Sequence, residues 1–136
     1  MKIDRFDIDG IAKPSSRYHH AVETTGHGRL LHVSGLFGVR PDGTFPDDAG
    51  AQIEQAWQNV LTVLQRRNMW PHALVKVNAY LTDRAYVPTY RAVRDRMLGD
   101  VATASTLLIV AGLADPKALV EIEAVAAAGD EPSTGA

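Results

Sequence analysis

The chain has 136 residues, of which 46% are hydrophobic and 22% are charged, with a formal net charge of −2 and no cysteine. This length and composition are typical of one globular domain that can build its own core. The lack of cysteine excludes disulfides, thiolate nucleophiles and thiolate metal sites. The 14 lysine and arginine residues are scattered along the sequence, so a nucleic-acid-binding protein is not expected.

The start of the chain shows no apolar run like that of a signal peptide. The N-terminal residues mix charged and apolar side chains, and no segment approaches the ~18–20 apolar residues that span a bilayer. We therefore expect a cytoplasmic protein without a membrane partner. Residues 1–128 are predicted to form the single domain, and residues 129–136 a disordered tail.

Two strands are predicted before the first helix, over residues 18–25 and 30–39. The short connection around Gly26 and Gly28 favours an antiparallel hairpin between them. Pro41 and Gly43 then predict a turn, because proline presets φ and glycine tolerates a positive φ.

The hydrophobic period changes to that of a helix from Asp47 onward. Asp47 and Asp48 suit the helix N-terminus, and Pro71 marks its end. The apolar stripe of this helix recurs at i, i+4, i+7 and i+11, and consists of Ile53, Trp57, Val60 and Leu64.

The rest of the chain alternates strand and helix signals. Residues 74–82 alternate as a strand, a second helix runs from Tyr86 toward Gly99, and residues 105–112 and 119–127 predict two further strands. The order β-β-α-β-α-β-β predicts an α+β fold, with two helices packed on one face of a mixed sheet. The sheet residues considered for a surface that meets another subunit are Leu36, Leu107 and Ile109.

Glu121 and Glu123 lie at i and i+2 of the last predicted strand, so both carboxylates point to one face, roughly 6.6 Å apart. In a partly dry cleft such a pair could supply a general acid or base. A solvated strand face is the alternative interpretation.

Tyr18 could position a substrate or a water molecule, or it could be an amphipathic edge aromatic. The neighbouring His19 and His20 point to opposite faces of an extended strand, so they cannot hold one ion together, and no metal is expected. Ser34 and Gly35 lack the G-x-S-x-G frame of a nucleophile turn.

Taken together, these segments resemble the YjgF family, also called the reactive intermediate deaminases (Rid). The resemblance covers residues 18–127 through the order and spacing of several short segments. They are Tyr18-His19-His20-Ala21-Val22, Leu31-His32-Val33-Ser34-Gly35, Pro41-Asp42-Gly43, Gln52, Gln55-Ala56, Asn59-Val60, Val75-Lys76-Val77, Tyr80-Leu81-Thr82-Asp83, Ser105-Thr106-Leu107 and 119–124.

The resemblance implies a chorismate-mutase-like fold and a homotrimer with a central barrel and three clefts between subunits. In the family's best-known members, these clefts hydrolyse enamines or imines to a 2-keto acid and ammonia without a cofactor. A cleft arginine grips the substrate carboxylate, and a glutamate with backbone groups places the water.

Four residues of this chain match the family's cleft. Glu121 falls on the water-positioning glutamate and Tyr18 on the cleft tyrosine. Gly35 matches the glycine that follows the serine, and Thr106 stands where many members have cysteine or threonine.

Three positions depart from the family's pattern. Ala104 replaces the carboxylate-gripping arginine, Leu36 the usual glutamine and Val87 the cleft asparagine. Alanine offers no charged fork to a carboxylate, so deamination of 2-imino acids should be weak or lost. Arg17 or Arg40 could replace the missing charge.

These departures leave three functions open. The first is hydrolytic deamination of a small imine or enamine that need not carry a carboxylate, with Glu121 as the catalytic residue. The second is a regulatory trimer that binds a small molecule without turnover. The third is the endoribonuclease or translation-inhibitor activity attributed to some relatives, against which the acidic net charge argues.

Overall fold

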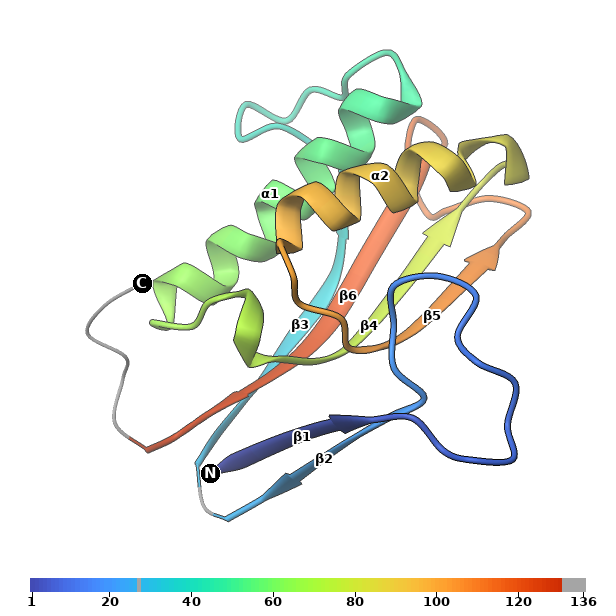
Figure 1. Ribbon diagram of the computed structural model, residues 1–136. Helices are drawn as coiled ribbons and strands as arrows, with labels where there is room; N and C mark the ends of the chain where they lie inside the picture. The colour runs from blue at the N-terminus through green and yellow to red at the C-terminus, as the bar shows by residue number, and fades with distance from the viewer. Residues whose placement is uncertain (27, 131–136) are drawn as a thin grey trace.

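The computed structural model describes residues 1–26 and 28–130 (Figure 1). Two helices lie side by side across one face of a four-stranded sheet, and a two-stranded sheet near the N-terminus stands beside it. The strands are β1 (Lys2–Phe6), β2 (Ala21–Thr25), β3 (Arg29–Phe37), β4 (Leu74–Leu81), β5 (Ala104–Ile109) and β6 (Val120–Ala128). The helices are α1 (Ala49–Arg66) and α2 (Val87–Leu98), with short 3-10 turns at Pro71–Ala73 and Arg84–Tyr86.

The four-stranded sheet has the order β3-β6-β4-β5. β6 pairs antiparallel with both β3 and β4, whereas β4 and β5 are parallel. The parallel pair needs a crossover connection, and α2 supplies it. The predicted α+β fold with a mixed sheet and two helices on one face is therefore confirmed.

Both helices form where the sequence pattern predicts them. The four stripe residues of α1 are fully buried against the sheet. The side chain of Asp48 caps this helix by accepting a hydrogen bond from the backbone N–H of Ala51 at 2.8 Å. α2 carries Pro88 in its first turn and stops before Gly99, whose φ of 63° suits glycine.

The alternation predicted for β4 and β6 is also observed. Val77, Ala79 and Leu81 of β4 are buried beneath the helices, as are Val120 and Ile122 of β6. The residues between them point to the opposite side of the sheet. We call that side the helix-free face; its side chains come from His32, Lys76, Asn78, Tyr80, Ala104, Thr106, Leu108, Glu121, Glu123 and Val125.

The predicted hairpin between the first two strand segments is wrong. β2 begins at Ala21 and pairs with β1, which the sequence analysis had not identified, while β3 pairs with β6. β1 has only five residues, three of them charged, so its alternation gave little hydrophobic signal. Pairing with β6 buries Val33 in the core, which a local hairpin would not do.

The predicted subunit-contact residues are also mostly misplaced. Leu36 and Leu107 pack against the core beneath the helices, and Ile109 is the one of the three that is clearly exposed, at 39%. The register of β3 with β6 shifts between Val33 and Leu36, and this bulge turns Leu36 to the helix side. None of the helices in residues 1–26 and 28–130 is long and apolar enough to cross a membrane. The tail prediction falls mainly on residues 131–136, outside the described range.

Candidate functional site

Glu121 lies on the helix-free face, where its side chain occupies the space in front of Gly35. A Cβ added to Gly35 would lie 2.5 Å from Oε2 and 2.7 Å from Cδ of Glu121. Gly35 sits in the β3 bulge, where the ladder to β6 is interrupted. Such interruptions free backbone groups from the sheet and are frequent next to active sites. The structure thus brings Glu121 and Gly35 into direct contact.

Glu123 shares the face of Glu121, as the sequence predicts, but has a different environment. Its Oε1 accepts hydrogen bonds from Nδ2 of Asn78 at 3.0 Å and from the hydroxyl of Tyr80 at 2.7 Å. The bond to Glu123 raises the pKa of the Tyr80 hydroxyl above its ordinary value. Glu123 is therefore tied to β4, whereas Glu121 faces the bulge.

A hollow of about 270 Å³ opens on this face, and its lining includes His32, Lys76, Asn78, Glu123 and Val125. Lys76 also donates a hydrogen bond from Nζ to Oγ1 of Thr106 at 2.8 Å. No role was predicted from the sequence for His32, Lys76 or Asn78. The alternation of β4 places Lys76 and Asn78 on one face, but only the strand order shows that Asn78 lies beside Glu123.

Ala104 and Thr106 lie two residues apart on β5 and share the helix-free face. Ala104 stands in register with Lys76, and Thr106 with Asn78. Lys76 is therefore the cation beside position 104, where the family's pattern has an arginine. It was not predicted from the sequence as a replacement for that charge. An ammonium is a point charge and does not provide the paired planar donors of a guanidinium.

Tyr18 lies in the loop that leads into β2, next to the start of β5. The neighbouring His19 forms a parallel bridge with Ala104, and its backbone N–H donates to the carbonyl of Thr103 at 3.0 Å. Tyr18 lines a hollow of about 630 Å³ formed mainly by residues 7–20. Tyr18 is thus next to the start of β5, and it also lines a hollow with Ser105 and Leu107 of that strand.

His19 and His20 serve to hold this loop. Oδ1 of Asp7 contacts Nδ1 of His19 at 3.2 Å and accepts the backbone N–H of His20 at 3.0 Å. These contacts lower the pKa of the Asp7 carboxyl, chiefly through the backbone hydrogen bond from His20. Within residues 1–26 and 28–130, no group of three or more histidine, aspartate or glutamate side chains could hold a metal ion.

Six of the seven predicted cleft residues fall into two groups within one chain. Glu121, Gly35 and Leu36 lie around the β3 edge, whereas Tyr18, Ala104 and Thr106 lie at the β5 edge. Glu121 lies on β6 and Gly35 on the neighbouring outer strand β3, so β4 separates this group from the residues at β5. Val87 begins α2 and packs against the core, on the helix side of the sheet.

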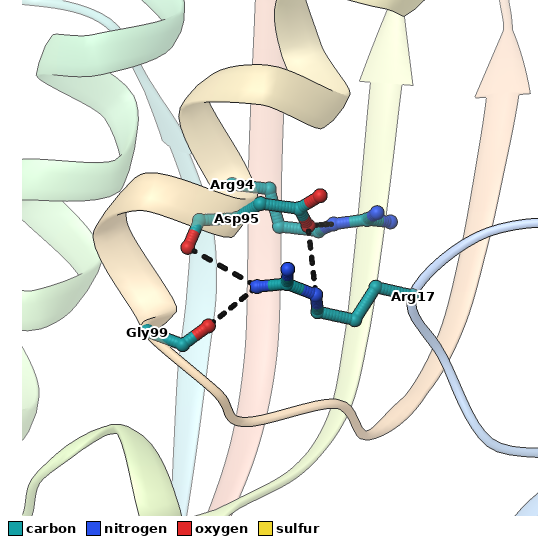
Figure 2. A network of polar contacts seen from close by, with 4 residues as sticks. All are labelled: Arg17, Arg94, Asp95 and Gly99. Carbon is teal, nitrogen blue, oxygen red and sulfur yellow. Dashed lines mark hydrogen bonds and ion pairs between the residues drawn. The ribbon is translucent and has the colours of Figure 1, made fainter.

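Both arginines considered as replacements for the missing charge are engaged elsewhere. Nη1 of Arg17 donates to the carbonyl oxygen of Gly99 at 2.5 Å, and its Nε lies 3.8 Å from Oδ1 of Asp95, at the end of α2 (Figure 2). Nη1 of Arg40 donates to Oγ1 of Thr44 at 3.0 Å, within its own turn.

Comparison with known proteins identifies the family. Residues 10–128 match the family model described as endoribonuclease L-PSP. A RutC family protein of Aquifex aeolicus is 30% identical over 115 residues, which are 83% of this chain and 90% of the relative. A crystal structure of a protein of the conserved Rid family from Yersinia pestis has a TM-score of 0.82 at 28% identity, covering 93% of this chain and 98% of that one.

A further crystal structure, of RidA from the bacterium Psychrobacter sp., has a TM-score of 0.69 and covers 90% of this chain and 98% of that one. At 24% identity it supports the fold alone. The Yersinia pestis structure agrees with the strand order and the two helices described above. The chain therefore belongs to the endoribonuclease L-PSP family, the family of the YjgF and Rid proteins, and carries alanine at position 104.

Proposed function

We propose that this chain is a cofactor-free hydrolase that deaminates a small imine or enamine in clefts between the subunits of a homotrimer. In this proposal Glu121 places or deprotonates the attacking water. Tyr18 and Thr106 orient the ligand, and Gly35 and Ala104 line the cleft. Leu36 and Val87, which the sequence also predicted for the cleft, pack on the helix side of the sheet and are not included. Hydrolysis adds water across the C=N bond and releases ammonia and a carbonyl compound.

The contact between Glu121 and the bulge at Gly35 is the observation that carries the proposal. The carboxylate lies 2.5 Å from where a Cβ of residue 35 would be, so it lies directly over the backbone of the bulge. A water molecule held there could meet both a carboxylate and backbone groups freed from the ladder. Such a position suits a general base, which must reach the proton it removes.

The strand order supports a cleft shared between subunits. Glu121 on β6 lies two strand spacings, roughly 10 Å, from β5, and four residues along β6 from Val125, which is in register with Ala104 through Lys76. A small molecule cannot bridge that distance within one sheet. Association of copies that sets the β3 edge of one protomer near the β5 edge of another would bring the two groups together.

The residues around Ala104 favour a substrate without a carboxylate. Alanine provides no donor, and the Lys76 ammonium beside it already donates to Thr106. A carboxylate would therefore meet one point charge and not a bidentate fork. We expect neutral imines to be better substrates than 2-imino acids.

Ammonia release from a panel of neutral and acidic imines tests the proposal. Glu121→Gln keeps the size of the side chain but removes its basicity, so turnover should fall by about 10²–10⁴-fold. Glu23→Gln, an exposed carboxylate on β2, is the matched control and should leave turnover unchanged. Equal activity of Glu121→Gln and the unmodified protein across the panel would contradict a catalytic Glu121.

A binding or regulatory trimer is the second candidate, and the alanine at position 104 favours it. In that case thermal-shift screening would find ligands that stabilise the protein, and none of them would be converted. Endoribonuclease activity receives no comparable support, because 16 acidic residues outnumber 14 basic ones. RNA association that does not change with salt concentration would exclude endoribonuclease activity.

A further inference from the structure

A third hollow lies on the helix side of the sheet edge, between α2, β5 and the N-terminal loop. Its volume is about 230 Å³, below the ~300–1,000 Å³ of pockets for drug-sized ligands. Its lining is rich in hydroxyl and guanidinium groups and consists of Ser15, Ser16, Tyr18, Arg91, Arg94, Ser105 and Leu107.

Arg94 is the unusual member of this lining, because it is a charged residue that is only 6% exposed. Its Nε donates to Oδ1 of Asp95 at 3.0 Å. Within residues 1–26 and 28–130, its buried Nη2 has no hydrogen-bond partner. In Figure 2 the guanidinium extends past Asp95, and its terminal nitrogens point away from both Asp95 and Arg17.

A buried guanidinium with an unmatched N–H group is costly in a folded protein. Burying an ion costs several kcal/mol unless a counter-charge and hydrogen bonds compensate for it. Asp95 is shared between Arg94 and Arg17, so one carboxylate faces two guanidiniums. Arg91, one turn earlier on α2, adds a third positive charge. The local charge is therefore positive, and the group that would complement it is an anion.

We propose that this hollow is a binding site for a compact oxyanion, either a carboxylate or a phosphate group. The Nη2 of Arg94 would donate to one oxygen, and the guanidinium of Arg91 would add a second charged contact. The hydroxyls of Ser15, Ser16 and Ser105 can each donate a hydrogen bond to the same group. Planar guanidinium donors match the geometry of both anions.

Tyr18 is common to this site and to the proposed cleft, but the other residues of this site lie apart from Glu121. Ser105 and Leu107 point to the helix side of β5, while Ala104, Thr106 and Glu121 point to the helix-free face. Within one protomer, Glu121 lies two strands away, about 10 Å across the sheet and on its opposite side. The inference therefore does not depend on turnover at Glu121.

Isothermal titration of the intact protein with inorganic phosphate and, separately, with acetate tests the site. The unmodified protein should bind at least one of the two at millimolar concentration. Arg94→Gln should weaken that binding by about tenfold or more, because a charge-assisted hydrogen bond is lost. Stronger binding of phosphate or of acetate identifies which oxyanion the site prefers, and either result supports the proposal.

Arg96→Gln is the matched control, since Arg96 lies on the same helix but its side chain is 58% exposed and pairs with Glu54. It should bind the anion as the unmodified protein does, and an equal loss in this variant would overturn the proposal by showing only general attraction. If Arg94→Gln does not fold, the exposed Arg91→Gln decides: severalfold weaker binding supports the site, and unchanged binding overturns it. Absence of anion binding by the unmodified protein also overturns the proposal. If, in addition, Arg94→Gln alters the oligomeric state, the hollow is a contact between copies of the chain and not an anion site.

Discussion

The lack of a side chain at Gly35 leaves room for the carboxylate of Glu121. Gly35 lies in the bulge of β3, and the Glu121 carboxylate fills the space that any larger residue would occupy. The contact does not depend on a special backbone conformation, because Gly35 is not among the glycines with positive φ. A substitution here should therefore act through the carboxylate.

Gly35→Ala should lower activity far more than it lowers stability. The new Cβ would lie 2.5 Å from Oε2, and the flexible carboxylate would have to move aside. A displacement of about 1 Å at a reacting group can cost roughly 10²-fold in rate, while the free energy of unfolding should fall by less than about 1 kcal/mol. Ammonia release and urea unfolding measure the two effects.

Gly112→Ala provides the comparison, because a Cβ at Gly112 would meet nothing within 4 Å. This variant should match the unmodified protein in both measurements. Normal turnover in Gly35→Ala would show that the position of Glu121 against the bulge is not needed for activity.

At the scale of elements, Gln52 links α1 to two loops that come from distant parts of the chain. Its Nε2 donates to the carbonyls of Pro46 and Lys117, both at 3.0 Å, and its Oε1 accepts from the backbone N–H of Leu119 at 2.9 Å. The side chain is 2% exposed. One glutamine thus satisfies three backbone groups and holds the segment that leads into β6 against α1.

Gln52→Leu should destabilise the protein by roughly 2–4 kcal/mol, because leucine leaves buried backbone groups without partners. Urea unfolding followed by circular dichroism measures this loss. Gln58→Leu, on the exposed side of the same helix, should change the unfolding free energy by less than about 0.5 kcal/mol. If the two variants are equally stable, the three hydrogen bonds of Gln52 contribute nothing net.

The elements differ in how well the sequence predicts them. α1, α2, β4 and β6 were predicted because their apolar residues recur with the period of a helix or of a strand. β1 and the pairing of β2 were not, because both strands are short, polar and paired with each other near the edge of the molecule. Strand pairing depends on contacts that no local period encodes.

At the scale of the whole molecule, the helix-free face has no second layer of elements within the described residues (Figure 1). It carries polar residues together with exposed apolar ones, notably Leu108 at 48%. A sheet whose second face is left open can be covered by other copies of the chain, which agrees with the proposed trimer.

Leu108→Glu should therefore shift the protein from trimer to monomer while leaving the fold intact. The new carboxylates would be brought into contact near the shared interface, where unpaired charge is strongly unfavourable. Sedimentation velocity measures the change in mass, and circular dichroism verifies the fold. Ile11→Glu, an exposed apolar residue of the N-terminal loop, is the control and should remain trimeric. A monomeric unmodified protein would contradict the proposed assembly.

The sequence by itself determined the family, the two helices, the buried faces of β4 and β6, and the shared direction of Glu121 and Glu123. These features depend on local period and on the order of short segments, which neighbouring residues specify. The tertiary structure alone decided that Glu121 meets Gly35 and that Glu123 meets Tyr80. It also decided that Arg94 is buried beside a hollow lined with hydroxyls. Each of these contacts joins residues far apart in the chain, and they meet only because burial of the common core sets the strand order and register.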